Sequence, residues 1–264
     1  MTRTVQNLGL AVLLAVAALP TLAQTTPAPA PAPEPDYTFT GNAGLFSDYR
    51  FRGISQTDRK PAFQGGFDFS HKSGFYLGNW NSNIDSSYFS GANLEMDFYG
   101  GYKGAVGDFS YDVGALYYYY NGSGNQAQYP GSFKIDNTEL YVSGGWGPFS
   151  LKYSHAISDF FGAPDSKNSY YVDGSVSYPL PQVAGLTLVG HVGYQSLKGG
   201  AKQTEIGGSV VDTVTDWKLG AVYDLSGWQL GASYIGTNRD LYNSLNPGRN
   251  LSSDTLVVSV GKSF

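Results

Sequence analysis

The 264 residues include 35 glycines, 21 tyrosines and 15 phenylalanines, no cysteine, and a net charge of −5. Without cysteine the chain cannot form disulfides, a thiol nucleophile or a Cys-ligated metal site. The acidic balance argues against a nucleic-acid partner, since binding nucleic acid needs a concentrated basic surface. Charged residues make up 14% of the chain, well under the ~25% of ordinary soluble domains, while tyrosine and phenylalanine favour strands.

Residues 1–23 have the pattern of a secretory signal peptide. Arg3 supplies the positive start, residues 8–19 are apolar, and Thr21-Leu22-Ala23 places small residues at the usual cleavage offsets. The apolar run is too short to cross a bilayer, and no other stretch approaches the ~18 apolar residues that a membrane helix needs. We therefore expect an exported chain that begins at Gln24 and enters a membrane, if at all, as strands.

Residues 24–36 alternate proline mainly with alanine. This composition predicts an extended polyproline-type spacer without a core of its own. We expect it to be a periplasmic tail that precedes the first strand, with a contact to a periplasmic partner as the alternative.

Residues 37–264 show period-2 segments separated by clusters of Gly, Pro, Asn and Asp, which predicts an all-β domain. About twelve strands are expected, at 37–52, 62–71, 74–83, 92–103, 107–120, 135–147, 148–157, 169–179, 185–197, 213–225, 227–237 and 254–264. In the fourth, Leu94, Met96 and Phe98 share one face, while Glu95 and Asp97 share the other. The same alternation would suit a soluble sandwich or lipocalin-like barrel with its apolar face inward.

Loop lengths and aromatic positions favour a transmembrane antiparallel β-barrel instead. Short connections at 104–106, 147–148 and 225–227 alternate with long ones at 121–134, 158–168, 198–212 and 238–253. Short periplasmic turns and longer extracellular loops are typical of outer-membrane barrels. Tyrosine and tryptophan also gather at the ends of the apolar faces, where a membrane interface would place them.

The end of the chain supports the same architecture. The last strand alternates apolar residues and finishes at Phe264, which resembles the ending recognised by the outer-membrane barrel assembly machinery. Lys262 departs from that pattern, since an apolar or aromatic residue is usual there. The expected partners are therefore outer-membrane lipids, the assembly machinery, and small solutes or ions, while the oligomeric state stays open.

One stretch near the start of the barrel carries a family resemblance. The segment 44–56, GLFSDYRFRGISQ, followed by 61–66, PAFQGG, resembles the opening of the TorF family of porin-like proteobacterial outer-membrane proteins. The resemblance implies a porin-like role in the outer membrane of a Gram-negative bacterium. It transfers no binding residues.

The polar faces of the predicted strands supply candidate lumen residues. Asp48, Arg50 and Arg52 lie at i, i+2 and i+4 of the first predicted strand, so all three should point the same way, towards a constriction. The alternative is that they form ion pairs with Glu95 or Asp97 and that the interior is filled. The full candidate set for the lumen or constriction is Asp48, Arg50, Arg52, Glu95, Asp97, Lys152, Asp173, His191, Asp216 and Lys218.

Nine acids against five bases are expected to face inward, which favours cations. The inward acids are Asp48, Asp68, Glu95, Asp97, Asp112, Glu139, Asp173, Asp216 and Asp224; the bases are Arg50, Arg52, Lys103, Lys152 and Lys218.

Catalysis has little support in the sequence. Ser154 and His155 are neighbours on a strand and face opposite ways, so they cannot form a nucleophile–base pair. His191 is the best lumen histidine, and a hydrogen-bonded wall residue is the simpler interpretation. We expect no enzyme, cofactor or metal.

The sequence thus favours a porin-like channel for passive diffusion of ions or small hydrophilic solutes. A closed structural or surface-interaction barrel is the main alternative, and a lipid-modifying enzyme is a more distant one.

Overall fold

The computed structural model describes residues 35–128, 130–241 and 249–264. The predicted signal peptide, residues 1–23, and all but the last two residues of the predicted spacer, 24–36, lie outside this range. Within the described range, no helix is both long enough and apolar enough to cross a membrane.

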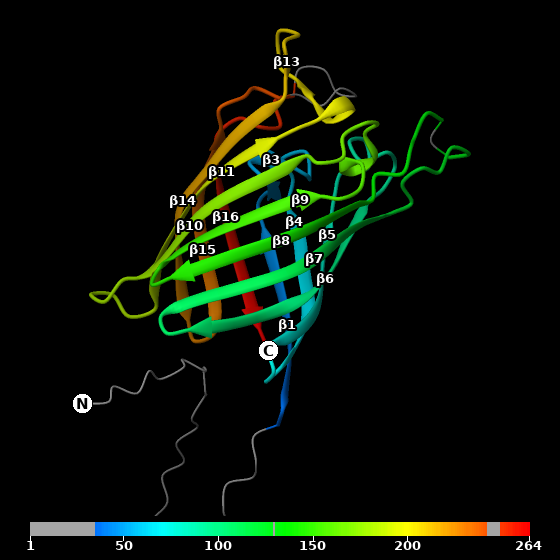
Figure 1. The fold of residues 1–264 in the computed structure, drawn as a ribbon. Helices are drawn as coiled ribbons and strands as arrows, with labels where there is room; N and C mark the ends of the chain where they lie inside the picture. The colour runs from blue at the N-terminus through cyan, green and yellow to red at the C-terminus, as the bar shows by residue number, and fades with distance from the viewer. Residues whose placement is uncertain (1–34, 129, 242–248) are drawn as a thin grey trace, which may run out of the picture. The chain divides into compact units, whose positions relative to one another are not determined.

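Over the described residues, twelve long antiparallel strands form a closed barrel (Figure 1). They are β1 (Tyr37–Phe46), β4 (Ala62–His71), β5 (Phe75–Asn83), β6 (Leu94–Val106), β7 (Phe109–Asn121), β8 (Asn137–Trp146), β9 (Phe149–Ala156), β10 (Tyr170–Pro179), β11 (Leu186–Ser196), β14 (Thr213–Leu225), β15 (Trp228–Thr237) and β16 (Thr255–Ser263). Each strand pairs with its neighbours in sequence, and β1 pairs with β16. The prediction of a twelve-stranded all-β barrel is confirmed.

The last residue takes part in closing the barrel. The Phe264 amide donates to the Gly41 carbonyl at 2.9 Å, and the Gly41 amide donates to the Phe264 carbonyl at 2.7 Å. A closed barrel leaves no strand edge, which is the condition for placing strands in lipid, where unpaired backbone groups are costly.

The wall has its apolar side chains outside and its polar side chains inside. On β14, Leu219 is 72% exposed, whereas Asp216 is fully buried within the barrel. On β11, Val192 and Leu188 are likewise exposed on the outer face. This distribution is the reverse of a soluble barrel and matches a membrane-spanning one.

The two rims of the barrel differ in their connections. At one rim, here called the short-turn rim, two to six residues join consecutive strands; at the other, the long-loop rim, ten to seventeen residues do. In the β14–β15 turn, Ser226 and Gly227 have φ of 53° and 85°, as a type I′ hairpin requires. The start of β1 and the end of β16 both lie at the short-turn rim.

Exposed aromatic side chains mark both rims. Those near the short turns are Tyr102, Phe109, Trp146, Phe149, Tyr178 and Trp228, and those near the long loops include Tyr117, Tyr153, Tyr194 and Tyr234. Rings of this kind sit well at a membrane–water interface, because the ring is apolar and its OH or NH needs a polar partner.

The first strand is shorter than the sequence predicted. β1 ends at Phe46, and residues 47–61, here called the lumen loop, contain only the two-residue strands β2 (Arg50–Phe51) and β3 (Ile54–Ser55). The Ser47 hydroxyl accepts a bond from the Val258 amide at 3.0 Å, which replaces a ladder bond to β16. Arg52 then has a φ of +48°. The prediction that Asp48, Arg50 and Arg52 share one face of a strand is therefore wrong.

The remaining short elements lie in the long loops. They are η1 (Phe160–Gly162), η2 (Gly199–Ala201), β12 (Gln203–Thr204) and β13 (Val210–Val211).

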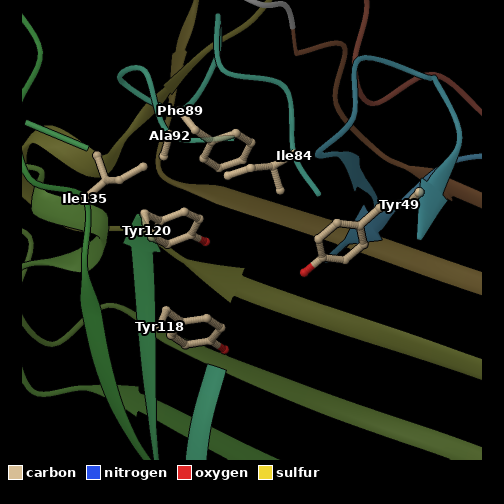
Figure 2. Packing of buried hydrophobic residues seen from close by; sticks show 8 residues of the cluster. Tyr49, Ile84, Phe89, Ala92, Tyr118, Tyr120 and Ile135 are labelled. Carbon is tan, nitrogen blue, oxygen red and sulfur yellow. The ribbon is translucent and has the colours of Figure 1, made fainter. Parts of the chain in front are cut away.

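An apolar cluster lies inside the barrel near the long-loop rim (Figure 2). Tyr118 and Tyr120 of β7 contribute to it together with Tyr49 of the lumen loop. The other members are Ala62, Ile84, Phe89, Ala92 and Ile135. Parts of three long connections, including residues 47–61 and 84–93, therefore pack inside this end of the barrel.

Candidate functional site

The lumen loop crosses the interior of the barrel. It leaves from β1 and returns at β4, which are adjacent strands, whereas β9 lies six strands from β1 in either direction around the ring. Arg52 of the loop reaches side chains of β8 and β10, which flank β9, and of β11, the next strand after β10. The loop therefore spans from one wall to the opposite one.

Arg52 is the far anchor of the lumen loop. Its Nη2 lies 2.7 Å from Glu139 Oε2 and 2.9 Å from Oε1, and its Nη1 donates to Gln195 Oε1 at 2.5 Å. The guanidinium also stacks over the Tyr171 ring at 4.3 Å. Burial by itself would lower the pKa of Arg52, but the Glu139 carboxylate more than offsets it and the pKa is raised. Arg52 therefore stays protonated.

Arg50 and Asp48 organise the near half of the loop. Arg50 Nε donates to Asp48 Oδ2 at 2.6 Å, and Arg50 Nη1 donates to the backbone carbonyls of Leu251 at 2.9 Å and Ser253 at 3.1 Å. Asp48 Oδ1 also accepts the hydroxyl of Ser55 at 2.6 Å. Burial lowers the pKa of Arg50 despite this carboxylate. These two side chains hold the loop to the segment before β16.

Tyr49 joins the loop to the acidic side of the wall. Its ring packs edge-on against Trp80 of β5, and its hydroxyl donates to Glu95 Oε1 at 3.3 Å. Burial raises the pKa of Tyr49, so the phenol stays a donor. Glu95 and Asp97 are 1% and 8% exposed, and one oxygen of each lacks a hydrogen-bond partner in the described structure.

The alternative ion pairs between the arginines and Glu95 or Asp97 do not form. The partner of Arg50 is Asp48, and the partner of Arg52 is Glu139. The sequence predicts that Glu139 faces inward but does not single it out as a site residue. Only its contact with Arg52 in the structure identifies it as the anchor of the lumen loop. The candidate set also lacks Gln195, Tyr171 and Tyr49. For Gln195 and Tyr171, the only sequence signal of a role in the lumen is their place on the inward face of an alternating strand.

His191 lies in a polar cluster on the wall that Tyr171 links to Arg52 of the lumen loop. Its Nδ1 contacts Asp173 of β10, and its Nε2 lies 2.8 Å from Asp216 Oδ2 of β14. Tyr171 also donates its hydroxyl to Asp216 Oδ1 at 2.9 Å. Lys218 is directly opposite His191 in the β11–β14 register. Both ring nitrogens of His191 are therefore engaged, which suits a structural or electrostatic role.

Lys152 takes a different partner. Its ammonium lies 4.0 Å from the centre of the Tyr141 ring, a cation–π contact within the wall. The ten candidate residues therefore divide among the lumen loop, the acidic pair on β6, the His191 cluster and Lys152, and they do not form a single ring.

These features define a class of protein: a closed antiparallel barrel with an apolar outer face, a polar interior and an inward-folded loop across its lumen. The chain belongs to the family described as "Bacterial protein of unknown function (Gcw_chp)", whose model matches residues 30–264. No curated protein matches the chain.

Two solved structures share the fold. The NanC porin superposes with a TM-score of 0.54 at 13% identity, covering 86% of this chain and 99% of its own. The KdgM porin gives a TM-score of 0.51 at 10% identity, covering 86% and 99%. At these identities the similarity shows the fold alone.

Proposed function

We propose that this protein is an outer-membrane channel for passive diffusion of ions or small hydrophilic solutes, narrowed by the lumen loop. The observation that carries the proposal is a closed barrel whose inward positions are polar and charged, Asp216 and Glu139 among them. Both fold neighbours named above are porins, and the opening segment resembles the TorF family.

The proposed orientation places the short-turn rim in the periplasm and the long-loop rim outside the cell. The N-terminal signal peptide and periplasmic spacer that the sequence predicts agree with it, since β1 begins at the short-turn rim. Phe264, which is 72% exposed and pairs with Gly41 through its backbone, is the proposed contact for the barrel assembly machinery.

The lumen loop is the proposed selectivity element. Charges in a narrow lumen act strongly on passing ions, and Glu95 and Asp97 lie beside the loop without a basic partner in the described structure. We therefore propose a preference for cations, with the Arg52–Glu139 pair setting the position of the loop.

Single-channel conductance in planar bilayers tests the proposal. Refolded wild type should give discrete steps, and reversal potentials in a salt gradient should show cation preference. Arg52→Ala releases the far anchor of the loop and should change the step size or the open fraction. Arg239→Ala is the matched control, because Arg239 also faces a carboxylate, Glu205 at 3.6 Å, outside the lumen loop.

A closed barrel is the second candidate, and one observation favours it. The lumen loop is held at both ends by buried ion pairs and hydrogen bonds, so it could fill the lumen completely. Silence from folded wild type and from Arg52→Ala would refute the channel and support the closed barrel. Silence from wild type with conduction by Arg52→Ala would identify the loop as a removable plug.

A further inference from the structure

A cavity of about 810 Å³ lies between the lumen loop and four long-loop connections. The connections are formed by the described residues of 84–93, 122–128 with 130–136, 157–169 and 197–212. Much of its lining is aromatic, contributed by Phe51, Phe89, Tyr120, Phe133, Phe160 and Phe161. A largely apolar cavity of this size at the mouth is unnecessary for a barrel that only passes ions.

The aromatic walls of the cavity are held in place by one another. The rings of Phe89 and Tyr120 are stacked, with centroids 5.4 Å apart and an interplanar angle of 6°. Figure 2 shows both residues from close by. Phe161 meets Phe51 and Tyr120 edge-on, each at 5.9 Å. A ligand would therefore meet preformed flat surfaces, which reduces the entropy cost of binding.

The charge of the cavity restricts what it can hold. Among the described lining residues, Arg52 is the only charged one, and Glu139 already neutralises it. The polar groups that remain are amides and hydroxyls, including Gln56 and Ser132; the Ser132 hydroxyl is buried without a hydrogen-bond partner in the described structure. Such a lining favours an uncharged ligand with a hydrogen-bonding edge.

We propose that this cavity binds a small neutral solute with a flat aromatic face and a polar edge, as in an aryl glycoside. Its volume lies in the ~300–1,000 Å³ range of small-molecule sites, which combine apolar walls with a few convergent polar groups. The site goes beyond the proposed function, because the ligand would bind at the mouth whether or not the lumen conducts.

Calorimetric titration of the barrel in lipid nanodiscs tests the proposal with three probes. Phenyl β-glucoside carries the aromatic face, methyl β-glucoside lacks it, and 4-carboxyphenyl β-glucoside adds a negative charge. The phenyl compound should bind at least tenfold more tightly than either of the others, after subtraction of its uptake by empty nanodiscs.

Two variants locate the binding. Phe133→Ala removes an aromatic wall that is 51% exposed, so folding should be intact, and it should weaken phenyl glucoside binding at least fivefold. Ala163→Trp puts a large ring at another lining position and should abolish binding. Phe149→Ala is the matched control, because Phe149 is 59% exposed at the opposite rim, and it should bind as wild type does.

Several outcomes would overturn the site. These are no binding of phenyl β-glucoside by folded wild type, equal affinity for the phenyl and methyl compounds, or unchanged binding in Ala163→Trp. Conductance is measured separately from binding. A barrel that binds the probe but does not conduct would refute the channel and support the site. A barrel that conducts but binds none of the probes would support the channel and refute the site.

Discussion

The barrel wall and the lumen loop contain the same charged residue types, but different interactions determine where their side chains point. On β14, Leu219 faces outward and Asp216 inward, and alternation along a paired strand determines both. In the lumen loop, Asp48, Arg50 and Arg52 also alternate, yet the strand has ended at Phe46 and their positions follow from ion pairs. Alternation therefore predicts facing only where neighbouring strands continue to pair.

The two regions also differ in what stabilises them. The wall is held by a continuous ladder of backbone hydrogen bonds between neighbouring strands, closed by β1 and β16. The loop depends on a few charged side chains that have lost most of their water, such as Arg52 and Glu139 at 9% and 1% exposure. Removing one member of such a pair leaves an uncompensated buried charge, whereas replacing both by apolar residues is often tolerated.

The largest expected effect comes from breaking the loop anchor. Glu139→Ala should lower the free energy of unfolding by about 3–5 kcal/mol, because it leaves the buried Arg52 charge without a partner. The double variant Arg52→Met, Glu139→Leu should recover most of that loss. Urea unfolding in lipid vesicles, followed by tryptophan fluorescence, measures both.

Glu205→Ala is the control for that experiment. It breaks the more exposed contact with Arg239 at 3.6 Å, which should be worth less than about 1 kcal/mol. A Glu139→Ala loss no larger than that of the control would show that this ion pair does not hold the loop.

The second effect concerns the facing of the wall. Leu219→Arg places a charge on the lipid face of β14 and should cost about 2–4 kcal/mol. Val222→Arg, on the lumen face of the same strand, should cost less than half as much, because that side faces the polar interior of the barrel and not lipid. Equal costs in the same unfolding assay would contradict the facing of β14.

The third effect tests the tight passage of the lumen loop. Gly53 has a φ of +81°, and a Cβ there would lie 2.4 Å from Thr237 Cγ2. Gly53→Ala should therefore cost more than Gly107→Ala, where φ is +61° and no atom lies within 4 Å. In Gly107→Ala the only cost is backbone strain, about 1–2 kcal/mol. Equal losses in thermal unfolding would mean that the loop is not packed against β15.

The smallest expected effect is a pH dependence of stability. It arises at Asp85, where the lumen loop contacts residues 84–93. Burial would raise the pKa of Asp85, but hydrogen bonds from Ser87 and from Lys60 lower it below its usual value. A carboxyl group whose pKa is lower in the folded protein stabilises the fold at pH values above its unfolded pKa, which is about 4. That stability is lost as the pH falls through the folded pKa.

Thermal unfolding of wild type and Asp85→Asn between pH 7 and pH 2 measures this effect. Wild type should have the higher midpoint at pH 7, and the difference should vanish in acid. Asp108→Asn, in the exposed β6–β7 turn, is the control for removing a carboxylate elsewhere. A wild-type advantage that grows on acidification would contradict the Lys60–Asp85 contact.

Parts of the candidate site followed from the sequence and parts did not. Alternation placed Glu95, Asp97, Asp173, His191 and Asp216 inward, and the structure has them there. It could not pair Arg52 with Glu139, because 87 residues separate them. Nor could it show that Tyr118, Tyr120 and Phe89 form an apolar cluster in a polar lumen, since their packing requires the long loops to fold inward.

The sequence by itself determined the strand count, the alternation of rims and the outward apolar face. These depend on a local period of two, on the lengths of the connections and on aromatic residues at the ends of the apolar faces. Only the tertiary structure decided where the first strand ends and what crosses the lumen. Those features depend on contacts between residues 46 to 203 positions apart, such as Tyr49 with Glu95 and Arg50 with Ser253. A local sequence pattern cannot predict such contacts, because they join segments that only the closed barrel brings together.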